Sequence, residues 1–307
     1  MLPIMRFSDL MKRARLLGAV QTAIVHPVSE VVLRSTLSAR SLGLIEPILV
    51  GPESRIRSVA EQAGLDLTNI PIHNTPHSHA SISEAARLAR EGKVELLVKG
   101  STSTDELMSV LVEAASGIRT ERRMSHVFVM EVATYHKLLL VTDGALNVTP
   151  DLAAKRDIVQ NAIDLAHALS IDCPKVAILA AQEKVKPFIP STIDAAALCK
   201  MADRDQITGG KLDGPLAFDN AISAEAARMK GIRSEVAGDA DILLAPDLEA
   251  GNMLAKQLTY LASARTAGIV MGARLPIVLT SRSEQEEGRV ISLALGVLVA
   301  HNRRRKP

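Results

Sequence analysis

Four apolar segments that are typical of β-strands are each followed by a short polar loop. Most of the loops contain a small hydroxyl residue, and several contain a glycine or a single cation. Their residues are His26, Pro27 and Ser29; Lys99, Gly100 and Ser101; Asp143, Gly144 and Asn147; and Thr280, Ser281 and Arg282. Backbone N–H groups at the start of a helix, together with the helix dipole, favour a bound anion. A cation beside such residues in more than one loop therefore indicates a phosphate site. Ordinary helix capping by serine or threonine is the alternative for any single loop.

Helix-like and strand-like segments alternate through the first half of the chain. Strands are predicted at 21–25, 46–50 and 95–98, and helices at 7–17, 29–42, 56–63, 81–90 and 104–115. This alternation predicts parallel βαβ units. Ligands of an open parallel sheet bind outside the carboxyl ends of its strands, which is where the polar loops occur.

The pattern changes near residue 148. Segments 126–132 and 137–142 predict a hairpin, and a long helix then opens with Thr149 as N-cap, Pro150 in its first position and Asp151 in its first turn. Further strands are predicted at 175–179, 241–244, 268–271 and 276–280, and helices at 192–202, 221–230, 252–262 and about 284–302. We expect one α/β lobe from residues 1–147 and 269–307, a second from 148–268, and an active site in the cleft between them.

Composition excludes several classes of protein. Of 307 residues, 47% are hydrophobic and 23% charged, as expected for a globular protein of two lobes. No apolar stretch is long enough to span a membrane, and the N-terminus lacks a signal-peptide core, which favours the cytoplasm. A net charge of +2 and 2% aromatic residues argue against nucleic acid as a partner. Cys173 and Cys199 are too few for a disulfide framework or a zinc site and are expected to be buried thiols.

Several segments together resemble the phosphotransacylase family, which comprises phosphate acetyltransferases and phosphate butyryltransferases. They are GIRTERRMS followed by HVFVMEV at 126–132, DGALNVTP at 143–150, DGPLAFDNAIS at 213–223, ADILLAPDLEAGNMLAKQL at 240–258 and PIVLTSR at 276–282. The resemblance covers most of the chain from about residue 95 onward and is looser before it. No single segment carries it alone.

The resemblance implies a fold and a reaction. The fold is a two-lobed α/β architecture like that of isocitrate and isopropylmalate dehydrogenases, with parallel or mixed sheets, flanking helices and the second lobe inserted into the first. The reaction moves a short acyl group, acetyl or butyryl, between coenzyme A and inorganic phosphate through an acyl phosphate, with no bound metal or redox cofactor. Family members also suggest a homodimer through the second lobe, for which segments 158–169 and 252–262 are suitable.

The family pattern assigns roles to the Ser-Arg pair near the end of the chain. It implies that Arg282 binds phosphate and that Ser281 hydrogen-bonds the reacting carbonyl or thiol. A second phosphate-binding arginine corresponds to Arg123, although Arg119 and Arg122 are close enough to compete for that role. Ser101 is a further candidate for phosphate. For Arg119, Arg122 and Arg123, the alternative is that all three lie on a solvated loop without a role in binding.

The general base is where this sequence departs from its family. Members place an aspartate a few residues beyond the Ser-Arg pair, whereas this chain reads SRSEQEEG. Glu284 occupies the position of the aspartate in the butyryl-type pattern, and Glu286 and Glu287 are alternatives. Favourable placement of a carboxylate at a helix N-terminus is the rival explanation.

Five residues are candidates for binding coenzyme A or the acyl group. They are Asn147, Asp213, Asn220, Gly251 and Asn252. Helix capping is the alternative for Asn220, and for Gly251 and Asn252 if they begin a helix. His26 and His126 have no partner at a recognisable spacing and are not expected to be bases.

Two other functions remain open at this point. A metal- and nicotinamide-dependent dehydrogenase of the same superfold would need clustered aspartates or a glycine-rich dinucleotide motif, and the sequence shows neither. A relative that binds coenzyme A and phosphate without catalysis is the second alternative, and the missing aspartate motivates it.

Overall fold

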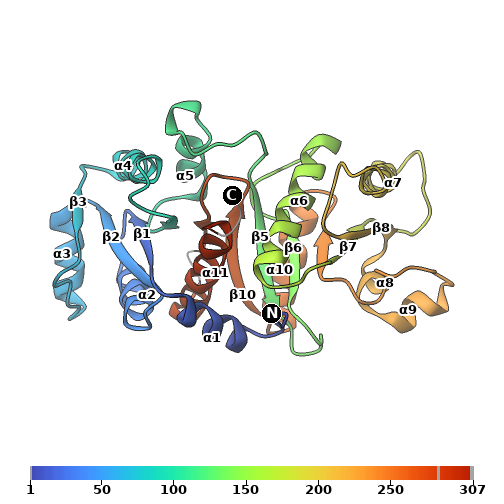
Figure 1. Ribbon diagram of the computed structural model, residues 1–307, viewed down its shortest axis with the longest axis horizontal. Helices are drawn as coiled ribbons and strands as arrows, with labels where there is room; N and C mark the ends of the chain where they lie inside the picture. Colours follow the sequence, from blue (N-terminus) through green and yellow to red (C-terminus); the bar gives the residue numbers. More distant parts are fainter. Residues whose placement is uncertain (1, 282–283, 305–307) are drawn as a thin grey trace. The chain divides into compact units, whose positions relative to one another are not determined.

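The computed structural model describes residues 2–281 and 284–304, and the chain divides into two units. We call Phe7–Arg122 with Ala267–Pro307 the terminal unit, and Met1–Arg6 with Arg123–Thr266 the central unit. The mixed α/β class expected from the sequence is confirmed: both units contain a sheet with helices (Figure 1).

The sheet of the terminal unit has the strand order β3-β2-β1-β4-β11-β10. The strands are β1 (Val20–Val25), β2 (Ile45–Gly51), β3 (Ile72–Asn74), β4 (Leu96–Lys99), β10 (Arg265–Met271) and β11 (Ile277–Val278). β1 pairs in parallel with β2 and β4, and β4 pairs in parallel with β11. β10 runs antiparallel to β11. The carboxyl ends of β1, β4 and β11 therefore lie at one edge of this sheet.

Helices flank these strands in the order the alternation predicts. They are α1 (Phe7–Leu17), α2 (Glu30–Ser41), α3 (Glu53–Gln62), α4 (Ser78–Arg90), α5 (Thr104–Leu111) and α11 (Glu286–Arg304). Every residue of α11 from Arg289 to Ala300 is buried, because this helix packs on β4 and β11 and against α1 and α2. A helix that is apolar on all sides is typical of such a central position.

The sheet of the central unit has the strand order β5-β6-β9-β7-β8. Its strands are β5 (Ser125–Glu131), β6 (Leu139–Thr142), β7 (Lys175–Leu179), β8 (Lys211–Leu216) and β9 (Ile242–Leu244). β5 and β6 form the antiparallel pair expected as a hairpin, and the remaining pairs are parallel. The helices are α6 (Leu152–Ala168), α7 (Pro190–Ala202), α8 (Phe218–Ile222), α9 (Ala224–Met229) and α10 (Leu248–Leu261).

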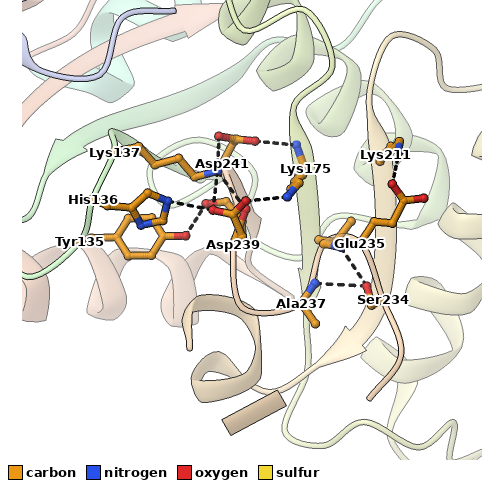
Figure 2. Close-up of polar contacts among 12 residues, drawn as sticks. Tyr135, His136, Lys137, Lys175, Lys211, Ser234, Glu235, Ala237, Asp239 and Asp241 are labelled. Carbon is orange, nitrogen blue, oxygen red and sulfur yellow. Dashed lines mark hydrogen bonds and ion pairs between the residues drawn. The ribbon is translucent and has the colours of Figure 1, made fainter. Parts of the chain in front are cut away.

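Charged residues tie together the amino-terminal ends of three strands in the central unit. Lys137 precedes β6, Lys175 begins β7, and Asp239 and Asp241 precede β9; the ammonium groups of both lysines point at these carboxylates (Figure 2). Lys137 Nζ lies 2.7 Å from Asp241 Oδ1 and 3.0 Å from Asp239 Oδ1. Burial alone would raise the pKa of Asp239, but hydrogen bonds from Lys175 and Lys137 outweigh it and lower that pKa to about 2.

Several sequence expectations differ from the structure at element boundaries. The units divide after Arg122 and not after residue 147, because β5 pairs with β6 and β6 pairs with β9. Asp151, not Thr149, caps α6 and accepts from the N–H of Ala154 at 2.8 Å. Cys173 is exposed and Cys199 half-buried, so neither is the fully buried thiol expected.

Among the described helices, none is both long and apolar enough to cross a membrane.

Candidate active site

The loops after β1 and β4 are joined by backbone hydrogen bonds. The N–H of Gly100 donates to the carbonyl of Val25 and the N–H of Ser101 to that of His26, both at 2.9 Å. A Cβ atom on Gly100 would lie 2.1 Å from the oxygen of Val25, so only glycine fits there. The Ser101 hydroxyl donates to the hydroxyl of Ser29 at 3.0 Å. Ser101, a predicted phosphate ligand, is thus held at the carboxyl edge of the sheet.

Lys99 places a positive charge at the same edge. It is the last residue of β4, it is buried, and its Nζ donates to the carbonyl of Thr102 at 3.1 Å. Its charge also acts on Glu284, where it lowers the pKa of the carboxyl. A buried cation at the end of a central strand is suited to binding an anion.

Glu284 and Ser281 bracket the turn that follows β11. The N–H of Ser281 donates to Glu284 Oε2 at 3.1 Å, and the N–H of Glu284 donates to the carbonyl of Ser281 at 3.2 Å. Glu284 Oε1 is buried and has no hydrogen-bond partner among residues 2–281 and 284–304. Arg282 and Ser283, which include the predicted phosphate ligand, lie outside the described residues.

Burial sets the acidity of Glu284. Removal of the carboxyl from water raises its pKa to about 7, against smaller lowering effects of the Ser281 N–H, Arg289 and Lys99. A general base works best when its pKa is close to the pH of operation. The carboxyl is therefore able to accept and return a proton near neutral pH.

Arg289 holds this turn from the first part of α11, and sequence reasoning missed it. Its Nη1 donates to Thr280 Oγ1 at 2.7 Å, its Nη2 to the carbonyl of Ser281 at 2.7 Å and its Nε to the carbonyl of Glu284 at 3.1 Å. The side chain is buried. A lone arginine at the start of the apolar run 290–300 was the signal that could have indicated it.

The two alternative carboxylates have different surroundings. Glu286 accepts a hydrogen bond from the hydroxyl of Ser38 on α2, which keeps it against that helix. Glu287 is exposed. Of the three carboxylates, Glu284 is the one that accepts a hydrogen bond from the N–H of Ser281.

The candidate arginines fall in both units. Arg119 belongs to the terminal unit and Arg123 to the central unit, and both side chains are exposed. The backbone of Arg123 is fixed: its N–H donates to Asp157 Oδ2 at 3.0 Å and its carbonyl accepts from Asn161 Nδ2 at 2.8 Å. Arg123 thus stands on a rigid base next to α6.

Three predicted coenzyme A residues come together in the central unit. Gly251 packs against Gly144, since a Cβ atom on Gly251 would lie 2.6 Å from the carbonyl oxygen of Asp143. Asn252 Nδ2 donates to the carbonyl of Gly144 at 2.9 Å, and Asn147 Nδ2 donates to Asp143 Oδ2 at 2.6 Å. Neither Gly251 nor Asn252 caps a helix, because α10 begins at Leu248 with Asp247 as its cap. The amides of both asparagines hold the loop after β6.

Asp213 and Asn220 lie apart from that group. Asp213 is in β8, and two strands, β7 and β9, separate it from β6, a distance of about 14 Å at normal strand spacing. Asn220 is fully buried and its Nδ2 donates to Glu183 Oε1. Their positions do not bring them into the loop of Asn147.

His26 and His126, which the sequence did not favour as bases, are both buried. His26 Nδ1 lies 3.1 Å from Ser81 Oγ, and burial is the main cause that lowers the pKa of its ring. The ring of His126 packs edge-on against Phe128, with centroids 4.3 Å apart. Within the described part of the chain, no group of three or more His, Cys, Asp or Glu side chains is arranged to hold a metal ion.

Comparison with known proteins identifies the family of the chain. A family model described as phosphate acetyl/butaryl transferase matches residues 78–297. Phosphate acetyltransferase of Rhizobium meliloti is 56% identical over 299 residues, which cover 97% of this chain and 95% of the relative. The chain belongs to the phosphate acetyl/butyryl transferase family.

Other family members extend the likeness. Phosphate butyryltransferase of Clostridium acetobutylicum is 40% identical over 300 residues, 98% of this chain and all of the relative. The crystal structure of a branched-chain phosphotransacylase from Enterococcus faecalis V583 superposes with a TM-score of 0.81 at 28% identity, covering 92% of this chain and 99% of that one. Family membership supports a transferase over the dehydrogenase alternative.

Proposed function

We propose that this protein transfers a short-chain acyl group, acetyl or butyryl, between coenzyme A and inorganic phosphate. Its membership in the phosphate acetyl/butyryl transferase family supports this reaction. The single structural observation that carries it is the half-buried Glu284 side chain, which accepts a hydrogen bond from the N–H of Ser281 at 3.1 Å and has its pKa raised to about 7. We assign that group as the base, a role for which the sequence offered Glu284, Glu286 and Glu287.

The reaction is a direct displacement at the acyl carbon. Glu284 takes the proton from the thiol of coenzyme A, and the thiolate attacks the carbonyl of the acyl phosphate. The C–S bond forms, the C–O bond to phosphate breaks, and inorganic phosphate leaves with the bonding electron pair. In the reverse direction the protonated Glu284 returns its proton to the departing thiolate. No oxidant or reductant takes part.

Burial of Glu284 reduces the cost of the proton transfer. A carboxyl with the ordinary pKa of 4.5 would accept a proton from a thiol of pKa about 8.5 at a cost of about 5 kcal/mol. A pKa of about 7 reduces this cost to about 2 kcal/mol. The difference is worth about two orders of magnitude in the equilibrium constant for transfer of the proton from the thiol to Glu284.

Phosphate and carbonyl contacts come from neighbouring loops. We assign phosphate binding to Arg282, on the family pattern, with Ser101 and the buried Lys99 at the same sheet edge. Ser281 is assigned to the oxygen of the reacting carbonyl, where a hydrogen-bond donor stabilises the developing negative charge. Arg123 remains the candidate for a second phosphate contact.

Coenzyme A contacts are assigned to the central unit. Asn147, Gly251 and Asn252 lie around the loop after β6, where the two asparagines are partly exposed. Asp213 and Asn220 rank below these residues. Asp213 lies in β8, apart from that loop, and Asn220 is fully buried with its amide bonded to Glu183. We place the protein in the cytoplasm, because its proposed acyl-CoA substrates are cytoplasmic metabolites.

A homodimer through α10 is also proposed. Three large apolar side chains of this helix are exposed: Met253, Tyr260 and Leu261, with Leu261 at 85%. Exposed apolar residues gathered on one helix are typical of an interface with a second copy of the chain.

The assay that tests the function follows loss of thioester absorbance when phosphate is added. Acetyl-CoA, propionyl-CoA and butyryl-CoA are offered separately, and their kcat/KM values rank the acyl preference. We expect phosphate-dependent turnover with at least one of them. A protein that binds coenzyme A and turns over none of the three would be the non-catalytic relative.

A further inference from the structure

Two consecutive residues of α11 make contact with the turn that carries Ser281 and Glu284. Arg289 directs three donors at three acceptors of that turn: Thr280 Oγ1, the carbonyl of Ser281 and the carbonyl of Glu284. The guanidinium is planar and rigid, so three bonds from it fix the relative positions of three residues. Lysine could keep the charge but could not reproduce this arrangement.

Gly288 meets the side chain of Glu284 itself. A Cβ atom at this position would lie 2.7 Å from Glu284 Oε1 and 3.0 Å from its Cγ. Gly288 is within the first turn of α11 and its φ is not in the left-handed region, so its backbone does not require glycine. Alanine would be the more favourable residue within a helix. The space left by the missing side chain is therefore occupied by the Glu284 carboxyl.

We propose that Gly288 and Arg289 are positioning residues for the acyl transfer, together forming a seat for Glu284. Arg289 fixes the backbone that carries Ser281 and Glu284, and Gly288 leaves the space in which the carboxyl lies. The proposal rests on the proposed function, in which Glu284 exchanges a proton with the thiol of coenzyme A. Displacement of a reacting group by about 1 Å costs roughly a hundredfold in rate, so such a seat matters for catalysis.

The decisive variant is Gly288→Ala. The three atoms nearest to its methyl group all belong to the flexible side chain of Glu284, so we expect the fold to be retained with an unchanged or higher Tm. We expect kcat to fall at least tenfold, with less than a twofold change in the KM for phosphate. A folded Gly288→Ala protein with kcat within twofold of wild type would overturn the proposal.

Gly296 offers a matched control on the same helix. A Cβ atom there would meet Leu96 at 2.7 Å and Val278 at 3.1 Å, and it would not meet Glu284. We expect Gly296→Ala to lower the Tm while kcat per folded molecule stays within twofold of wild type. If Gly296→Ala reduced kcat as much as Gly288→Ala, the loss would reflect helix packing and the seat would be rejected.

Two variants test the role of Arg289: Arg289→Lys keeps the charge and changes the shape of the side chain, and Arg289→Gln removes the charge. The charged groups that act on Glu284 are Arg289 on α11 and Lys99 at the end of β4. Glu286, two residues on, is turned toward Ser38 of α2. We expect Arg289→Lys and Arg289→Gln both to lose at least tenfold in kcat. Arg289→Gln should also move the limb of the pH–rate profile that belongs to Glu284 to higher pH, because it removes a cation that favours the ionised carboxylate. Arg289→Lys should leave that limb in place.

The variants distinguish a failure of the positioning role of Gly288 and Arg289 from a failure of Glu284 as the base. Full activity of Glu284→Gln would refute the proposed base and with it the seat. An inactive Glu284→Gln beside fully active Gly288→Ala and Arg289→Lys would refute the seat alone. If the Arg289 variants do not fold, the pair Gly288→Ala and Gly296→Ala decides.

Discussion

Glu284 is a carboxyl that the fold keeps partly out of water, and this carries a cost in stability. Because its folded-state pKa of about 7 lies above the ordinary 4.5, the folded protein binds more protons than the unfolded chain between these values. The contribution of Glu284 to stability is therefore fully present below pH 4.5 and is lost as the pH rises through 7.

Glu284→Gln should remove this cost. Glutamine keeps an acceptor for the N–H of Ser281 and does not ionise. We expect the free energy of unfolding of the variant to exceed that of wild type by at most about 3 kcal/mol at pH 8, with the difference vanishing toward pH 4.5. Urea unfolding at several pH values measures this. A variant less stable than wild type at pH 8 would contradict the account.

Arg282→Ala tests the phosphate ligand taken from the family pattern. We expect kcat/KM for phosphate to fall more than tenfold, the loss of about one charge-assisted hydrogen bond, with the Tm unchanged. Arg274→Ala, which removes an exposed arginine eight residues earlier, is the control. Near-normal turnover of Arg282→Ala would refute the assignment.

The sequence indicated some of these residues and not others, for a physical reason. Ser281 and Glu284 are only three positions apart in the chain, so their pairing follows from local order. The contacts of Arg289 with Thr280, and of Gly288 with the Glu284 carboxyl, depend on how α11 leaves the turn after β11. Neither propensity nor spacing specifies that direction.

At the scale of elements, the charged network at the amino-terminal ends of β6, β7 and β9 is a place where a single substitution should lower the stability of the fold. Asp241 accepts from Lys137 Nζ at 2.7 Å and from the N–H of Lys175 at 2.8 Å, and it is buried. We expect Asp241→Asn to cost about 2 kcal/mol in the free energy of unfolding, because it removes the charge that pairs with a largely buried lysine.

The pair Lys211–Glu235 provides the control within the same unit (Figure 2). Both side chains are well exposed, so Glu235→Gln should leave the free energy of unfolding nearly unchanged. Denaturant titration of the two variants measures the difference. Equal effects would show that burial does not strengthen the network.

Most elements with a plain hydrophobic period were predicted, whereas β3, β8 and the start of α10 were not. Gly214 and Pro215 are depleted in strands, and β8 accommodates them because it is the last strand in the order of its sheet. Gly251 suggested a helix start, but it lies inside α10 because its close approach to Gly144 needs a residue without a side chain. The errors at β8 and α10 arise where tertiary packing outweighs local preference.

At the scale of the whole molecule, the exposed face of α10 predicts self-association. Leu261→Glu places a charge on a side chain that is 85% exposed in the single chain. We expect the wild type to sediment as a dimer and the variant as a monomer. Leu16→Glu on α1, equally exposed at 86%, should leave the dimer intact. A wild-type monomer at micromolar concentration would contradict the proposed interface.

The central claim is that this chain performs acyl transfer with Glu284 as its base. The most direct measurement is phosphate-dependent loss of thioester absorbance by wild type and by Glu284→Gln, with no metal or nucleotide added. We expect turnover by wild type with acetyl-CoA, propionyl-CoA or butyryl-CoA, and a loss of about a hundredfold or more in the variant. Coenzyme A binding without turnover by the wild type, or a fully active Glu284→Gln, would contradict that claim.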